Sequence, residues 1–255
     1  MKTRKMKLGF AFMAMIFLSG LNAQEKTTQA FWIHEDVVKP GMVAEYESVC
    51  KELTANMKKY GLKDMNSIVA QTLDNHYLWV GPIENMAQID RPIFKNLAEK
   101  MGAEKMGALF DRMDKCYDIE QNYVLNLDPE LSYTPSGLTQ TPEGQPYRKF
   151  HYFHYTPGNR AKVMAKAKEI KEMFESNNSK MEYRLYKSGF GVRGEYLMVA
   201  VAAKDAGDYA AKVAKNNEAM GESWVKLYNT FMATLEDYQI VEGIMRPDMA
   251  YVPSN

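Results

Sequence analysis

The chain contains the same short motifs twice, at a nearly constant spacing. Pro40-Gly41 recurs as Pro157-Gly158, residues 77–80 (YLWV) recur as 196–199 (YLMV), and residues 129–135 (PELSYTP) recur as 247–253 (PDMAYVP). The shifts between the copies are 117, 119 and 118 residues. Two copies at this period indicate a duplicated domain rather than a solenoid. We therefore expect a fold that uses one unit twice.

Each copy carries the same order of secondary-structure signals. A strand rich in aromatic and β-branched residues precedes the Pro-Gly turn, and a helix, a hairpin, a long helix and a final strand follow it. In the first copy we expect these elements at 31–37, 43–57, 67–73 with 76–80, 92–113 and 117–127. In the second copy we expect them at 150–155, 163–174, 181–186 with 195–201, 209–231 and 238–244. The order βαββαβ is that of the ferredoxin-like motif.

A ferredoxin-like sheet has helices on one face only, and its bare apolar face must be buried against something. Two copies in one chain can pack their bare faces together or curl into an eight-stranded barrel. We predict an α+β fold of two tandem ferredoxin-like βαββαβ units, packed sheet to sheet as a fused dimeric α/β barrel. The first unit is expected at 28–128 and the second at 146–253, with a proline-rich linker at 129–145.

Residues 1–23 have the features of a cleavable secretory signal. A basic start leads into an uncharged, mostly apolar run at 8–21, and Ala23 suits the last position before a cut. The run has 14 residues, fewer than the roughly 20 that span a bilayer, which disfavours the alternative of an uncleaved anchor. We expect an exported protein, periplasmic or secreted, without a stable membrane span after cleavage. Loss of the signal's basic residues leaves a mildly acidic chain, so we expect no nucleic-acid partner.

The first strand, the Lys39-Pro40-Gly41 turn and the helix that carries Glu45-Tyr46 resemble the opening of the dimeric α/β-barrel superfamily. That group includes antibiotic-biosynthesis-monooxygenase-like and NIPSNAP-like domains. Thr156-Pro157-Gly158 repeats the turn, so the resemblance covers nearly all of the mature chain as topology. The resemblance implies functions that range from cofactor-free oxygenases, haem-degrading enzymes and isomerases to ligand-binding proteins. It therefore indicates a fold and leaves the activity open.

Two motifs that suggest cofactors or metals have simpler interpretations. Residues 189–194 (GFGVRG) match a dinucleotide-binding pattern, but a strand rather than a helix follows them, so we interpret them as a hairpin turn. His151 and His154 lie three apart on an expected strand and would point to opposite faces, so they cannot hold one ion together. We therefore expect neither a metal site nor a cofactor.

Histidines on the first strand of each copy are candidates for catalysis. His34 and His151 occupy equivalent positions when the Pro-Gly turns are aligned. An imidazole on a central strand, facing the barrel, can act as a general base or bind a ligand. The alternative is that each is a hydrogen-bonded core residue.

A ligand site, if present, is expected in the second copy, because its strands are richer in aromatic and hydrogen-bonding side chains. The expected ligand-binding residues are His151, Tyr152, His154, Tyr183 and Arg184. Arg184 would favour a carboxylate or another anion, although a solvated strand arginine is equally compatible with the sequence. Aromatic residues are also ordinary strand material.

These observations predict an exported small-molecule-binding protein. Its ligand is expected to be small and apolar or anionic, held in a cleft between the sheets or under the helices. The alternative is a cofactor-free small-molecule enzyme of the oxygenase or isomerase type, which uses a strand histidine as base.

Overall fold

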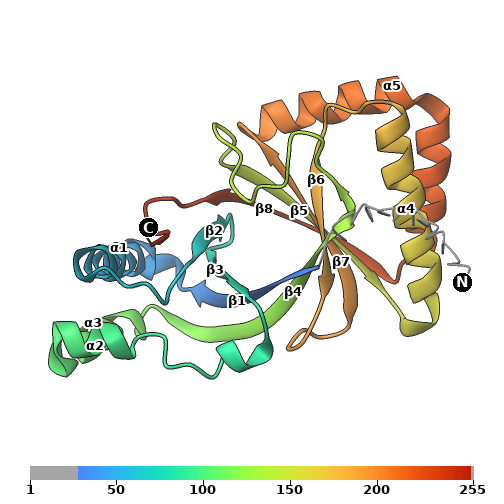
Figure 1. Cartoon of the computed structure of the whole chain (residues 1–255). Helices are drawn as coiled ribbons and strands as arrows, with labels where there is room; N and C mark the ends of the chain where they lie inside the picture. Colours follow the sequence, from blue (N-terminus) through green and yellow to red (C-terminus); the bar gives the residue numbers. More distant parts are fainter. Residues whose placement is uncertain (1–27, 254–255) are drawn as a thin grey trace, which may run out of the picture.

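The computed structural model describes residues 28–253 of the chain, and the predicted signal at 1–23 lies outside them. Eight β-strands form a barrel, and α-helices pack on two sides of it (Figure 1). The strands are β1 (Gln29–Val38), β2 (Ile68–Thr72), β3 (His76–Ile83), β4 (Tyr117–Tyr133), β5 (Tyr147–Tyr155), β6 (Tyr183–Ser188), β7 (Glu195–Ala203) and β8 (Asp237–Met245). The helices are α1 (Val43–Tyr60), α2 (Lys95–Met101), α3 (Ala103–Met113), α4 (Arg160–Ser176) and α5 (Ala206–Met232). No helix within 28–253 is long and apolar enough to cross a membrane.

The strands close into one antiparallel barrel in the order β1-β3-β2-β8-β5-β7-β6-β4. The prediction of two ferredoxin-like units packed sheet to sheet is therefore wrong, because the strands form a single closed sheet. At the seams, β2 hydrogen-bonds to β8 and β4 hydrogen-bonds to β6. Closure pairs the edge strands that two separate sheets would leave exposed.

We call β1–β4 with α1–α3 the first half, and β5–β8 with α4 and α5 the second half. The assignment of 28–128, 129–145 and 146–253 as unit, linker and unit stays a prediction. In both halves a short 3₁₀ turn, Pro40–Met42 or Pro157–Asn159, joins the first strand to the helix that follows. Figure 1 shows α1–α3 on one side of the barrel, with α4 and α5 on the other.

Side chains alternate along the strands between the barrel interior and the helices. The interior is packed by an apolar cluster that draws on all eight strands and on no helix, and that includes Phe31, Tyr123, Phe150 and Tyr186. A second cluster joins the outer face of the first half to α1–α3, and a third joins the second half to α4 and α5. Space for a ligand must therefore be sought on the helix side of the sheet or at the barrel ends.

The predicted long helix at 92–113 is two helices in the structure. Gly102 separates α2 from α3 with a φ of 92°, in the left-handed region that favours glycine. The predicted helix at 209–231 lies within α5, which is broken at Gly221. The segment between β3 and α2 contributes to the wall of the pocket described below.

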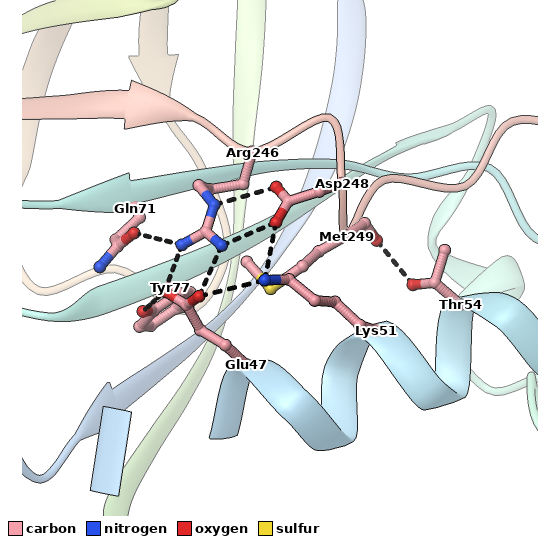
Figure 2. A network of polar contacts seen from close by, with 8 residues as sticks. All are labelled: Glu47, Lys51, Thr54, Gln71, Tyr77, Arg246, Asp248 and Met249. Atoms are coloured by element: carbon pink, nitrogen blue, oxygen red, sulfur yellow. Dashed lines mark hydrogen bonds and ion pairs between the residues drawn. The ribbon is translucent and has the colours of Figure 1, made fainter. Parts of the chain in front are cut away.

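An ionic network fastens the end of the second half to the first helix of the first half (Figure 2). Arg246 follows β8, and its Nη2 lies 2.7 Å from Glu47 Oε2 of α1. The same guanidinium group contacts Asp248 Oδ1 at 3.0 Å and Gln71 Oε1 at 2.6 Å. These bonds hold α1 against β2, and α1 carries Tyr46, which hydrogen-bonds Asp36.

Candidate functional site

A pocket of about 900 Å³ lies on the helix side of the first half. Its walls come from β1, β3, the start of β4, α1, α3 and the segment between β3 and α2. The aromatic side chains that line it are Trp32, Trp79, Phe94, Phe110 and Tyr117. Polar and charged side chains lie among these rings in the same wall, and a wall that combines both kinds of group can hold a small organic molecule.

His34 and Asp36 are polar members of this wall, and both come from β1. Residues two apart on a strand share a face, so both side chains point away from the barrel interior. His34 Nε2 lies 3.1 Å from Asp36 Oδ1. Asp36 is 1% exposed, whereas 25% of the His34 side chain remains exposed. The pair, called here the His34–Asp36 dyad, therefore offers an accessible imidazole backed by a buried carboxylate.

Tyr46 and Trp79 hold the buried carboxylate of the dyad. The Tyr46 hydroxyl donates to Asp36 Oδ2 at 2.5 Å and accepts from Trp79 Nε1 at 3.0 Å. An indole N–H can only donate, so the single hydroxyl proton of Tyr46 is directed at Asp36. Asp36 Oδ1 has no hydrogen-bond partner among the described residues, because its close contact with His34 lacks hydrogen-bond geometry. One buried carboxylate oxygen is thus left for the imidazole or for a bound ligand.

Asn122 and Trp32 determine which nitrogen of His34 carries a proton. Trp32 Nε1 donates to Asn122 Oδ1 at 3.1 Å, which identifies this amide atom as the acceptor oxygen. The same oxygen lies 3.0 Å from His34 Nδ1, so Nδ1 must be the protonated, donating nitrogen. In the neutral imidazole the basic nitrogen is then Nε2, beside Asp36.

The electrostatic surroundings of His34 favour its protonated form. Burial alone would lower its pKa, but the adjacent Asp36 carboxylate and the Asn122 contact outweigh burial and raise the pKa above 6.5. A raised pKa makes the neutral imidazole a stronger proton acceptor and moves its use as a base to higher pH. The imidazolium that forms is stabilised by Asp36.

Glu120 of β4 adds a second carboxylate close to the dyad. Ligand atoms of His34, Asp36 and Glu120 all lie within 4.8 Å of one another. An imidazole with two carboxylates is a donor set that divalent transition metals accept. Neither Asp36 nor Glu120 was predicted to be a site residue.

His151, the equivalent histidine of the second half, has both ring nitrogens engaged. Nδ1 lies 2.6 Å from the hydroxyl of Tyr238, and Nε2 lies 2.9 Å from the hydroxyl of Tyr209. Burial, aided by Lys149, lowers its pKa to about 4. His151 is therefore neutral near pH 7, hydrogen-bonded at both nitrogens, and placed under α5. Its role as a catalytic base stays a prediction that this geometry does not favour.

The structure does not gather the five predicted ligand-binding residues on one face. Tyr152, His154 and Arg184 point into the barrel, whereas His151 and Tyr183 point toward the helices. His154 packs against Tyr196, with ring centroids 5.2 Å apart. The prediction that His151 and His154 face opposite sides of their strand is confirmed.

The glycine-rich segment 189–194 is the turn between β6 and β7, so its interpretation as a hairpin is confirmed. Gly191 has a φ of 86°, and a Cβ there would lie 2.6 Å from the carbonyl oxygen of Asn122. The glycines therefore allow this turn to lie against β4, next to the residue that orients His34.

No protein-family model and no curated protein sequence matches the chain. Solved structures with the same fold include an anthrone oxidase-like protein, at 10% identity and a TM-score of 0.56, which covers 87% of this chain and 92% of that one. A candidate monooxygenase from Fusobacterium nucleatum has 10% identity and a TM-score of 0.53, covering 86% and 93%. Another from Lactobacillus acidophilus has 11% identity and a TM-score of 0.51, covering 86% and 94%. At identities this low, the structural similarity shows a shared barrel fold and nothing more.

Proposed function

We propose that the first-half pocket binds a flat, largely apolar small molecule and that His34 removes a proton from it. The observation that supports this most strongly is the hydrogen-bonded state of His34. Its Nδ1–H is held by Asn122, which leaves Nε2 as the basic nitrogen at the wall of an aromatic pocket, beside a buried carboxylate.

The proposed step is general-base catalysis. A proton passes from an acidic C–H or O–H of the ligand to His34 Nε2, and the resulting imidazolium pairs with Asp36. Positioned bases of this kind typically contribute about 10²–10⁴-fold to a rate. Trp32 and Trp79 provide flat surfaces for an aromatic ligand.

The structural neighbours suggest what can follow deprotonation. They are described as monooxygenases and as anthrone oxidase-like. We therefore propose the cofactor-free oxygenase type, in which the deprotonated ligand reduces dioxygen. For anthrone the balanced reaction consumes one dioxygen and yields anthraquinone and water. Membership of the antibiotic-biosynthesis-monooxygenase-like or NIPSNAP-like groups stays a prediction.

The test separates binding, deprotonation and oxidation. Protein without residues 1–23 is incubated anaerobically with anthrone in deuterated buffer, and loss of the methylene proton signal is followed by NMR. Air is then admitted, and oxygen uptake and anthraquinone formation are measured. Exchange by wild type and by His151→Gln, but not by His34→Gln, supports the proposal. Equal exchange by His34→Gln contradicts it.

A pure binding protein is the second candidate, favoured by the size and aromatic lining of the pocket. If the protein only binds, anthrone should quench the fluorescence of Trp32 and Trp79 without exchange of its methylene protons. Native mass spectrometry of protein purified from its own host would then identify the natural ligand.

Export is part of the proposed function, because the basic start and short apolar run at 1–23 favour a periplasmic or secreted protein. N-terminal sequencing of the mature protein tests this. A start near Gln24 supports it, and an intact Met1 in the membrane fraction contradicts it.

A further inference from the structure

Two arginines are buried at one end of the barrel, away from the His34 pocket. Arg148 of β5 is 2% exposed and Arg184 of β6 is 5% exposed. They flank β7, where Arg148 pairs with Ala202 and Arg184 pairs with Ala200. The small alanines leave room above β7 for two guanidinium groups.

Neither guanidinium group has an acidic partner. Among residues 28–253, no carboxylate lies within the 4.0 Å of an ion pair from Arg148 or Arg184, although the chain forms many ion pairs elsewhere. Burial, together with repulsion by the positive charge of Arg184, lowers the pKa of Arg148 to about 10. Buried charges without counter-charges are unfavourable and are normally compensated.

The acceptors that both guanidinium groups contact are neutral carbonyl oxygens. Arg148 donates to the carbonyl oxygens of Gln145, Gln140 and Tyr147, at 2.5, 2.8 and 2.9 Å. Arg184 donates to the carbonyl oxygen of Thr139 at 2.8 Å. These four bonds leave further N–H donors of both groups for another acceptor.

Most of these oxygens belong to residues 134–146, called here the barrel-end loop. It contains no helix or strand, and its residues 135–139 are exposed. Gly137 and Gly144 have φ values of 105° and 68°, which glycine adopts without strain. The Gln140 side chain accepts a hydrogen bond from the Tyr186 hydroxyl. Displacement of Gln140 would therefore free Arg148 and a third donor, Tyr186.

We propose that this end of the barrel is a binding site for a small oxyanion, a carboxylate or a phosphate group, held by Arg148 and Arg184. The barrel-end loop closes the site, and the carbonyl oxygens of Thr139 and Gln140 give way to the oxygens of the anion. Guanidinium groups match the bidentate geometry of both classes of anion. The site is independent of the dyad and of the proposed reaction.

The test measures anion binding to protein without residues 1–23. Inorganic phosphate and acetate are titrated separately by calorimetry at constant ionic strength, with chloride as the balancing salt, and melting temperatures are recorded in parallel. The variants are Arg184→Met and Arg148→Met. Arg193→Met is the matched control, because Arg193 is exposed on the β6–β7 turn.

Binding of phosphate or acetate by wild type and Arg193→Met, weakened at least about tenfold in Arg184→Met, supports the site. Selective binding of one anion identifies the ligand class. The ligand-free Arg184→Met variant should melt no lower than wild type, because a buried uncompensated charge has been removed. An unchanged affinity in Arg184→Met, or wild type that responds to neither anion beyond chloride, would overturn the proposal. A lower melting temperature in Arg184→Met without anion binding by wild type would show that the arginines only hold the loop.

Discussion

The two halves place a histidine at the same point of the first strand and surround it differently. His34 faces a pocket, with one nitrogen held by Asn122 and the other next to Asp36. His151 lies under α5, with each nitrogen bonded to a tyrosine hydroxyl. Burial lowers the pKa of His151, whereas around His34 the contacts with Asp36 and Asn122 together outweigh burial and raise the pKa.

The residues on the neighbouring strands, rather than the histidine itself, therefore determine its hydrogen bonding and its pKa. The cross-strand partners of His34 are Trp79 and Asn122, both of which take part in the polar network of the pocket. The partners of His151 are Val199 and Ile240, which are apolar. The sheet therefore places a polar network and a buried carboxylate around His34, whereas the polar contacts of His151 are the hydroxyls of Tyr238 and Tyr209.

The largest expected difference between the halves is in catalysis. His34→Gln should lower the rate of anthrone deprotonation at least about 100-fold, because it removes the base. His151→Gln should leave that rate within about threefold of wild type, because its contacts lie in the other half. Anaerobic deuterium exchange measures both rates. A larger loss in His151→Gln would reverse the comparison.

Asp36→Asn tests whether the charge next to His34 sets its pKa, because asparagine has nearly the same shape as aspartate and no charge. The pKa of His34 should fall, so the rising limb of the pH–rate profile should move to lower pH. The maximal rate should fall about 10- to 100-fold, because the imidazolium loses its counter-ion. Asp237→Asn, an exposed site on β8, is the control and should change neither quantity. An unshifted profile in Asp36→Asn would show that the dyad does not set the pKa.

Arg246→Met tests whether the C-terminal segment holds α1 in place. The change should lower the free energy of unfolding by roughly 1–3 kcal/mol, because Glu47 loses its partner in a partly buried network. The ion pair lowers the pKa of Glu47 to about 2 from 4.5, so the difference should be full above pH 4.5 and disappear as the pH falls through 2. Urea unfolding at several pH values measures this, with Arg193→Met as control. A pH-independent difference would assign the loss to packing instead.

The last effects expected are opposite pH dependences of stability from the two histidines. The raised pKa of His34 contributes stability below pH 6.5 that is lost as the pH rises through its folded value. The lowered pKa of His151 contributes stability above pH 6.5 that is lost as the pH falls toward 4. Unfolding of His34→Gln and His151→Gln across pH 4–8 should show differences from wild type of opposite slope. Slopes of the same sign would refute the contrast.

The sequence predicted the local elements well, because strand alternation and helical spacing depend on neighbouring residues. Closure into an eight-stranded barrel was one of two options, but the pairing of β2 with β8 and of β4 with β6 was not predicted, since edge pairing depends on contacts between distant segments. The interruption at Gly102 was not predicted because the helical spacing of apolar residues continues across it.

The site was predictable only in part. His34 was identified, but it was expected to face the barrel and it faces the helices. Asp36 could have been found, because residues i and i+2 of a strand share a face. Asn122 and Tyr46 could not, since they reach His34 and Asp36 through strand register and helix packing. A ligand site was predicted in the second half because its strands are richer in aromatic residues. Those side chains lie on both faces of the sheet and therefore do not form one site.

The central claim is that a ligand binds beside His34 and does not contact His151. The chain has four histidines, so the imidazole signals of ¹⁵N-labelled protein can be assigned with single His→Gln variants. Titration of this protein with anthrone, or with the natural ligand from native mass spectrometry, tests the claim most directly. We predict that the His34 signals shift and that its pKa changes, while the His151 signals stay fixed with a pKa near 4. Shifts confined to His151 or to His154 would contradict this account.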